Sequence, residues 1–304
     1  MRIRTGKTIH IERIIFILFC CVPPVVSWLI FYVYGNLSSF GMAFTDRMGN
    51  FSTENFVRFW QELASTDSEI RLAFRNTFLT FGIQMLCFPF QVMVSYFLYK
   101  KIPGSKIYRF LFLLPSMFCA VATTMALQRI VSVRGFIAQW LQDIQGLSYA
   151  PEIFADSRFA NTAVLLHMVW ASFAGDLIIW GGTFARIPED VLEAGRIDGT
   201  NWWKEFIYII VPVVWPTVAL KLVLSFCGIF SASGAVFLLT KGNYGTQTLS
   251  NWMYMQVYNV TGGAGSSNVF NYMSAVGMAI SVVALVLSRV IRRWTDKVFN
   301  EVEF

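Results

Sequence analysis

The sequence predicts an all-helical integral membrane protein with six transmembrane helices, on the evidence of its composition and its long apolar runs. Of its 304 residues, 56% are hydrophobic and 14% are charged, whereas soluble domains average about 45 to 50% and about 25%. A hydrocarbon core of about 30 Å needs about 20 apolar residues per helix. The runs are continuous rather than alternating, which favours helices over the strands of a barrel.

Six segments are long and apolar enough to cross a bilayer. They are residues 14–34, 76–99, 108–130, 159–182, 206–240 and 270–291. The apolar run of the first is 21 residues long, longer than the about 7 to 15 residues of a cleavable signal peptide, so we expect it to be retained. The fifth is longer than one span requires, which indicates a tilted or kinked helix.

These segments set the expected organisation of the chain. It consists of a basic tail (1–13), a first transmembrane helix (14–34), an extracytoplasmic loop (35–75), a core of five transmembrane helices (76–291) that includes a polar loop (186–212), and a second tail (292–304).

The distribution of basic residues predicts the orientation. Fifteen of the 24 Lys and Arg residues lie close to span ends in the two tails, in the connection after the second span and in the polar loop. Eight others are spread over three long loops on the other side. The positive-inside rule therefore places both termini and the polar loop in the cytoplasm. The net charge of +6 is explained by this topology and by anionic headgroups, not by nucleic acid.

The sequence lacks the motifs of several enzyme classes. It has no phosphate loop, no Gly-x-Ser-x-Gly elbow and no His-Glu-x-x-His, so we expect no ATP hydrolysis and no catalysis by this chain. Its five cysteines lie in apolar spans without a Cys-x-x-Cys, and its two histidines do not cluster, which favours no disulfide framework and no metal site. We expect His167 to be buried and hydrogen-bonded rather than catalytic.

The polar loop is predicted to form two short helices joined by a turn. Pro188 at a first helical position, followed by two acidic residues, begins a helix that stops near Gly195 or Gly199. Asp198 or Thr200 then caps an amphipathic aromatic helix over residues 202–211, which runs on into the next span.

The spacing of this loop resembles that of a known family. Glu193-Ala194, then Gly199, then nine residues, then Ile209-x-Val211-Pro212 is similar to the signature loop of permease subunits of ATP-binding-cassette (ABC) importers. The Ile197-Asp198-Gly199 variant and Pro216 resemble the carbohydrate-uptake branch, the binding-protein-dependent importers of the maltose and glycerol-phosphate type. Asn55-Phe56, Asn76-Thr77, Gly104, Arg109-Phe110 and Leu114-Pro115 follow the same order as in that branch.

Three departures accompany the resemblance. The family usually has a second alanine at the position of Gly195, leucine at Val211, and often Gly-Gly-Pro where Gly242-Asn243-Tyr244 stands. The last lies in a loop that the family places near the substrate entrance.

The resemblance implies a permease subunit that forms half of the pathway for a sugar, an oligosaccharide or a related polyol in a bacterial cell membrane. The implied partners are two ATPase subunits, which carry ATP and Mg²⁺, a second permease expected to be a different chain, an extracytoplasmic solute-binding protein and membrane lipid. The residues implied to couple the loop to the ATPase are Glu193, Ala194, Gly195, Asp198, Gly199, Ile209 and Pro212. The alternative is an amphipathic loop lying on the headgroups.

Polar and aromatic residues within the spans are candidates for a solute pathway, because sugar rings pack on aromatic faces and their hydroxyls need hydrogen-bond partners. The candidates are Trp170, Phe173, Asp176, Lys221, Phe226, Phe230 and Ser231. Such aromatic residues also face lipid or pack against one another. Asp176 and Lys221 are predicted at similar depths, so they either form an ion pair or extend separately to the interface.

Two other classes remain open from the sequence. A secondary transporter would carry inverted internal repeats, and a non-transporting membrane scaffold or receptor would tolerate changes in the polar loop.

Overall fold

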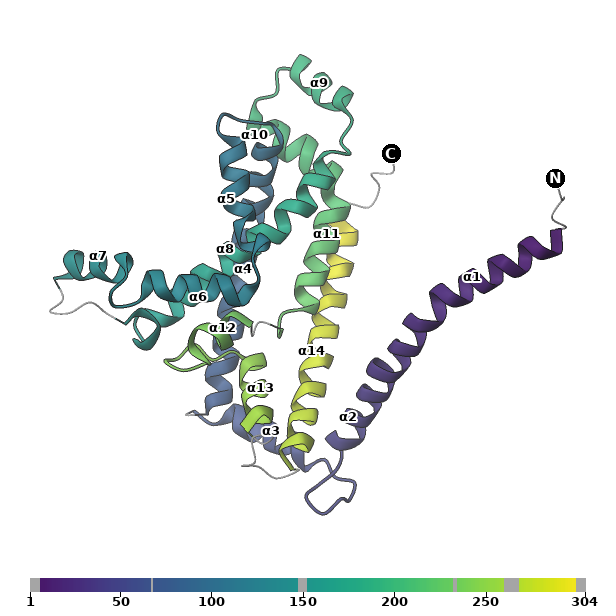
Figure 1. Cartoon of the computed structure of the whole chain (residues 1–304), viewed down its shortest axis with the longest axis vertical. Helices are drawn as coiled ribbons and strands as arrows, with labels where there is room; N and C mark the ends of the chain where they lie inside the picture. Colours follow the sequence, from purple (N-terminus) through teal and green to yellow (C-terminus); the bar gives the residue numbers. More distant parts are fainter. Residues whose placement is uncertain (1–5, 67, 147–151, 232–233, 260–267, 299–304) are drawn as a thin grey trace. The chain divides into compact units, whose positions relative to one another are not determined.

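The computed structural model describes residues 6–66, 68–146, 152–231, 234–259 and 268–298, with the side chains of 6–12, 141 and 145 left out (Figure 1). The first five residues of the expected tail 1–13, and residues 299–304 of the expected tail 292–304, lie outside this part. Within it every long element is a helix, and Thr45 and Phe51 form an isolated bridge. The predicted all-helical class is confirmed. The chain forms two compact units, residues 1–61 with 257–279 and residues 62–256 with 280–304.

Five described helices are long and apolar enough to cross a membrane, and a bent pair brings the number to six when it counts as one span. The five are 13–43, 69–99, 160–184, 202–227 and 268–298. The expected third span lies in the bent pair, whose first helix is α5 (Ser105–Met117) and whose second part, Ala120–Ile144, begins with α6 (Ala120–Val131). The break is at Phe118 and Cys119, which both have extended backbone. A continuous apolar run does not reveal such a break, because it changes backbone direction and not hydrophobicity.

The first unit begins with one nearly continuous helix, made of α1 (Gly6–Ser27), the π-helical η1 (Trp28–Tyr34) and α2 (Gly35–Ala43). It thus continues nine residues beyond the expected end at Tyr34. The chain then turns into α3 (Glu54–Ala64), so the expected loop 35–75 is mostly helical. The Asn55 side chain fixes this turn by donating to the carbonyls of Ala43 (3.3 Å) and Thr45 (3.0 Å).

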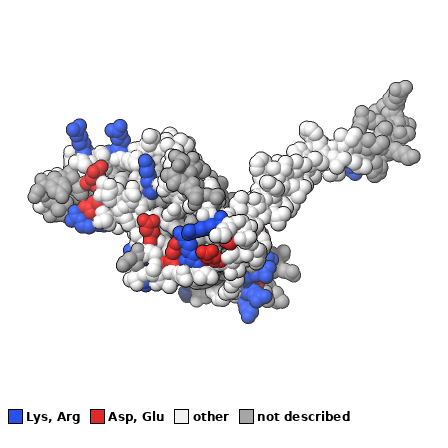
Figure 2. Space-filling view, turned by 90° about the horizontal axis from the view of Figure 1, so that it is seen from below, with Lys and Arg blue, Asp and Glu red and all other residues white. Residues whose placement is uncertain are grey.

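The second unit is built around three packed helices, α4 (Glu69–Tyr99), α5 and α8 (Ala160–Phe184). Between α6 and α8 lie α7 (Phe136–Gln145) and η2 (Ile153–Ala155). A large apolar core joins α4 and α8 to the segment after residue 205, with Tyr96, Trp180, Phe184 and Ile210 fully buried. On the face drawn in Figure 2, charged side chains form small groups among mostly uncharged residues, as expected for a chain with several membrane-spanning helices.

The expected fifth segment, 206–240, is two helices instead of one. α11 (Val211–Cys227) ends at Gly228, and α12 (Gly234–Thr240) begins after a turn in which the Ser231 amide donates to the Gly228 carbonyl. At 1.5 Å per residue a helix over the whole segment would be about 50 Å long, well beyond a bilayer core of about 30 Å. The segment holds one helix long enough to cross a membrane, which ends at Cys227, so the predicted span is shorter than the segment 206–240.

The turn between α12 and α13 (Leu249–Asn259) is fixed by α4. The Asn76 side chain donates to the carbonyls of Gly245 (2.7 Å) and Gln247 (2.9 Å), and the Thr77 hydroxyl accepts from the Leu249 amide (2.9 Å). The Asn76-Thr77 pair therefore has a structural role. The last helix, α14 (Asn268–Val298), runs through both units.

Candidate functional site

Helix α9 (Glu189–Ile197) presents one face to the protein and one to the exterior. Leu192 and Gly195 are buried, whereas Glu193 and Ala194 are exposed and Ile197 is 85% exposed. Acidic residues occupy its first turn, where the helix dipole favours them. In Figure 1, α9 lies at one tip of the second unit, beyond the ends of α5 and α11. Its outer face is thus an open, partly apolar surface.

The turn after α9 is built on a glycine and an asparagine. Gly199 has a φ of +70°, the left-handed conformation that glycine adopts without strain, so its predicted role in the bend is confirmed. Asn201 caps the following helix, since its Oδ1 accepts from the amides of Trp203 (3.1 Å) and Lys204 (3.0 Å). The prediction that Asp198 or Thr200 is this cap was wrong. The Thr200 hydroxyl instead donates to the Gly195 carbonyl (2.7 Å), which ties the turn to α9.

The second helix of the loop passes into a span without interruption. It consists of α10 (Trp202–Lys204), the π-helical η3 (Glu205–Ile210) and α11. Pro212 is the second residue of α11 and has no amide hydrogen to donate. The Val211 amide donates to Phe206, five residues back, so the helix widens just before the proline. A π-helical turn thus directly precedes Pro212.

Gly195 and Ile209 hold the two helices of the loop together. A Cβ added at Gly195 would lie 2.5 Å from the Cδ1 of Ile209, so the side chain of Ile209 packs directly on the α9 backbone. The residues named from the resemblance therefore divide into two sets. Glu193, Ala194, Asp198 and Gly199 are exposed, whereas Gly195, Ile209 and Pro212 are partly or fully enclosed within the protein.

A buried carboxylate, absent from the sequence-based candidates, anchors η3 to the end of α4. Glu205 is 4% exposed. Its Oε1 accepts from the Tyr96 hydroxyl (2.6 Å), and its Oε2 accepts from the Lys100 ammonium (2.5 Å). The available signal was a lone acidic residue at the start of an apolar, aromatic run, but its partners lie 109 and 105 residues away.

Asp176 and Lys221 form an ion pair between α8 and α11, in which the Lys221 ammonium donates to the Asp176 Oδ1. The pairing considered from their depths is confirmed. One helical turn from Asp176, the hydroxyl of Ser172 accepts from the side chain of Gln91 on α4 (2.7 Å). Gln91 was also missed, although a glutamine in an apolar span is itself a signal.

The aromatic candidates have separate surroundings. Phe173 is 6% exposed and packs against Phe90 and Phe112. Phe226 meets Phe81 of α4 edge-on at 4.8 Å between ring centroids. Phe230 is buried against Phe74 and Phe78, and Ser231 is exposed in the turn after α11. These three rings have the packing contacts that the sequence left as the alternative.

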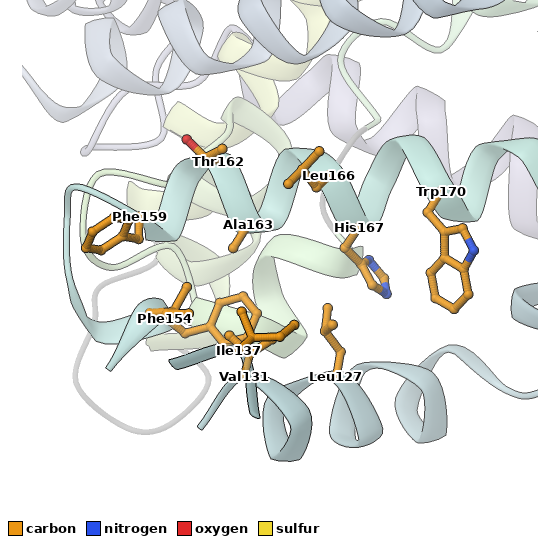
Figure 3. A pocket seen from close by; sticks show the side chains of 11 residues that line it. Leu127, Val131, Ile137, Phe154, Phe159, Thr162, Ala163, Leu166, His167 and Trp170 are labelled. Atoms are coloured by element: carbon orange, nitrogen blue, oxygen red, sulfur yellow. The ribbon is translucent and has the colours of Figure 1, made fainter. Parts of the chain in front are cut away.

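Trp170 and His167 line an apolar cavity of about 450 Å³ between α6, η2 and α8. Figure 3 shows both rings pointing from α8 toward the helix that carries Leu127. His167 is buried as predicted, but both of its ring nitrogens are without a hydrogen-bond partner among the described residues, because the side chains around it are almost all apolar. The hydrogen bond expected for it is not found in this part of the chain.

Comparisons with known proteins find relatives in one functional group. The maltose/maltodextrin transport system permease protein MalF of Vibrio cholerae is 28% identical over 260 residues, which cover 80% of this chain and 48% of the relative. The chain thus spans about half the length of the maltose relatives it matches. The lactose transport system permease protein LacF of Rhizobium radiobacter is 24% identical over 88% of this chain and 90% of its own.

A solved structure has a similar fold. A chain of the bacterial alginate ABC transporter, in complex with an alginate pentasaccharide-bound periplasmic protein, superposes with a TM-score of 0.76 at 20% identity. The alignment covers 97% of this chain and 98% of that one. No family model matches the sequence.

Proposed function

We propose that this chain, whose relatives are carbohydrate permease proteins and whose fold is that of an ABC importer chain, is a permease subunit of an ABC importer. It forms half of a transmembrane pathway for a sugar, an oligosaccharide or a related polyol. The observation that carries the proposal is the α9 loop, which has an open outer face and an enclosed, continuous connection into α11.

In this proposal both termini and the α9 loop are cytoplasmic, as the distribution of Lys and Arg favours. The chain works in a bacterial cell membrane with a second permease, two ATPase subunits that bind ATP and Mg²⁺, and an extracytoplasmic binding protein. It performs no catalysis itself. The solved alginate transporter supports the proposal of a binding-protein partner, because its structure includes a periplasmic protein.

The exposed face of α9 is suited to insertion into a groove on an ATPase subunit. Ala194 and Ile197 offer apolar contact, and Glu193 beside them offers a charge that a basic or hydrogen-bonding group can fix. Gly195 and Ile209 keep α9 and η3 together, so a displacement of α9 moves η3 and with it α11. The loop therefore transmits movement without chemistry of its own.

The solute pathway is best supported around the ion pair of Asp176 and Lys221. Charged groups within a span are costly unless they are paired or face water, and this pair lies within one turn of the Gln91–Ser172 hydrogen bond. Together they form a polar stripe on α4, α8 and α11 that offers donors and acceptors to sugar hydroxyls. Trp170, Phe173, Phe226, Phe230 and Ser231 are proposed as flanking positions.

The proposal is tested on the complete importer in proteoliposomes with Glu193→Ala. We expect co-purification of the ATPase subunits and ATP-driven uptake to fall at least about tenfold, the effect of losing one important contact. Asp143→Ala is the matched control, because Asp143 is also an exposed carboxylate on a helix, α7, but lies outside the loop. Unchanged association and uptake in Glu193→Ala would contradict the coupling role. Uptake driven by an ion gradient without ATP would instead identify a secondary transporter.

A further inference from the structure

We propose that Tyr96, Lys100 and Glu205 form a mechanical link, called here the Glu205 link, through which the α9 loop moves α4 as well as α11. The inference rests on the proposed function and adds a residue set that the signature spacing does not contain. It means that one loop drives two spans, one through the continuous chain and one through a buried ion pair.

The geometry of the Glu205 link is that of a fixed joint. Both carboxylate oxygens are occupied, one by the Tyr96 hydroxyl at 2.6 Å and the other by the Lys100 ammonium at 2.5 Å. The Glu205 side chain is 5% exposed and that of Lys100 is 24% exposed. Pulling the partners apart would leave a charge unpaired in an apolar core, which is far more costly than separating two apolar surfaces.

The surroundings of the link resist sideways movement. The Tyr96 ring lies against Phe184 (5.9 Å between centroids) and Phe206 (5.5 Å), and the Lys100 ammonium lies 5.1 Å from the centre of the same ring. Phe97 of α4 also meets Trp202 of α10 at 5.4 Å. The end of α4 therefore contacts both α10 and η3, the two helical segments that precede Pro212.

The position of the link in the chain gives it a distinct mechanical effect. Glu205 is the first residue of η3, and α11 follows from the same helix. Without the link, movement of α9 would reach α11 directly through the backbone and α4 only through apolar packing. With the link, α4 moves too, and α4 packs on α8 and donates to Ser172 beside the ion pair of Asp176. The link thus extends the movement to the polar stripe.

Two native cysteines allow the inference to be tested. Cys87 lies on α4 and Cys227 ends α11. In the complete importer, the rate at which N-ethylmaleimide labels each cysteine is measured by mass spectrometry, with and without ATP plus vanadate, which traps the closed ATPase subunits. We expect trapping to change the labelling rates of both cysteines in the wild-type protein.

The decisive variant is Lys100→Met with Glu205→Gln, which removes both charges together and leaves no unpaired charge in the core. We expect the trapping effect at Cys87 to shrink about fivefold or more, within the usual range of coupling between sites, while the effect at Cys227 persists. Lys101→Met is the control, because Lys101 is the exposed neighbour of Lys100. The melting temperature of the double variant is measured as well. If it equals the wild-type value, a reduced response at Cys87 reflects lost coupling and not lost stability.

Three outcomes would overturn the link. The first is an unchanged Cys87 response in the double variant. The second is a wild-type protein in which trapping changes the labelling of Cys227 but not that of Cys87. The third is an equal loss of both responses in the double variant. If trapping changes neither cysteine in the wild-type protein, and Glu193→Ala also leaves ATPase association intact, the proposed function fails together with the link. If Glu193→Ala uncouples the importer while the double variant responds normally, the link alone fails.

Discussion

Glu205 and Asp176 are both carboxylates held by a lysine inside the second unit, but they are held to different extents. Glu205 accepts hydrogen bonds on both oxygens, from Tyr96 and Lys100, within a large apolar core. Among the described residues, Asp176 accepts on one oxygen, from the Lys221 ammonium. Its side chain is 14% exposed, compared with 5% for Glu205.

The difference indicates two kinds of ion pair. A carboxylate with both oxygens hydrogen-bonded and little access to water has no other partner available, so its contacts are permanent. A carboxylate with one strong partner and some exposure can accept a hydroxyl or a water without leaving a charge unpaired. We therefore expect structural effects at Glu205 and transport effects at Asp176.

The largest effect is expected for Lys100→Met, which leaves the Glu205 carboxylate charged and buried with one remaining donor. Removing one partner of a buried pair costs about 3 to 5 kcal/mol, and we expect a loss of that size in the free energy of unfolding. It is measured by denaturant titration of the purified chain in detergent.

Two controls accompany this measurement. Lys101→Met should change the free energy of unfolding little, because Lys101 is exposed. Adding Glu205→Gln to Lys100→Met should recover most of the loss. A cost below about 1 kcal/mol, typical of a surface pair, would mean that Glu205 is solvated and would break the comparison.

How much of this could be predicted from the sequence depends on how local each feature is. The helices follow from apolar runs, and the bend at Gly199 follows from glycine at a fixed place in a spaced motif. The cap was misplaced because Asp198, Thr200 and Asn201 are all good capping residues, and the helix start that selects among them is set by packing of the aromatic face.

Features that depend on distant residues could not be predicted in this way. Nothing near Glu205 in the sequence indicates Tyr96 or Lys100, since the contact exists only after α4 and η3 pack. Asp176 and Lys221 were paired by their depth in the membrane. This argument works when each span holds few charged residues, because few pairings are then possible. The break after Cys227 was missed because Gly228 and Ser231 do not interrupt hydrophobicity strongly enough to end a span.

A second, smaller effect is expected for Tyr96→Phe, which removes the other donor to Glu205 and keeps the ring. A hydrogen bond to a charged group contributes about 1.5 to 3 kcal/mol, so the free energy of unfolding should fall by about 2 kcal/mol. Denaturant titration checks this, with Tyr99→Phe as the matched control on the neighbouring turn. Equal effects in the two variants would show that ring packing, not the hydroxyl, is what matters at Tyr96.

Lys221→Met should affect stability less than either change at the Glu205 link. Because Asp176 is partly accessible, water can replace the ammonium, and we expect a loss of about 1 kcal/mol. Uptake by the complete importer should fall much more than stability, since the polar stripe loses its cation. A destabilisation as large as that of Lys100→Met would show that Asp176 is a joint of the same kind as Glu205. Unchanged uptake would remove the ion pair from the pathway.

An effect on stability as small as that of Lys221→Met is expected for Asn201→Ala, which removes the cap of α10 four residues before Glu205. Loss of a cap typically costs about 1 kcal/mol, and Asn201→Asp should cost less because aspartate also accepts from the amides of Trp203 and Lys204. The measurement is again denaturant titration, combined with Lys100→Met in a double-mutant cycle. If the link holds η3 independently of its cap, the two losses add. If the double variant loses much less than the sum, the cap and the ion pair depend on one another, and the joint at Glu205 extends to the turn that carries α9.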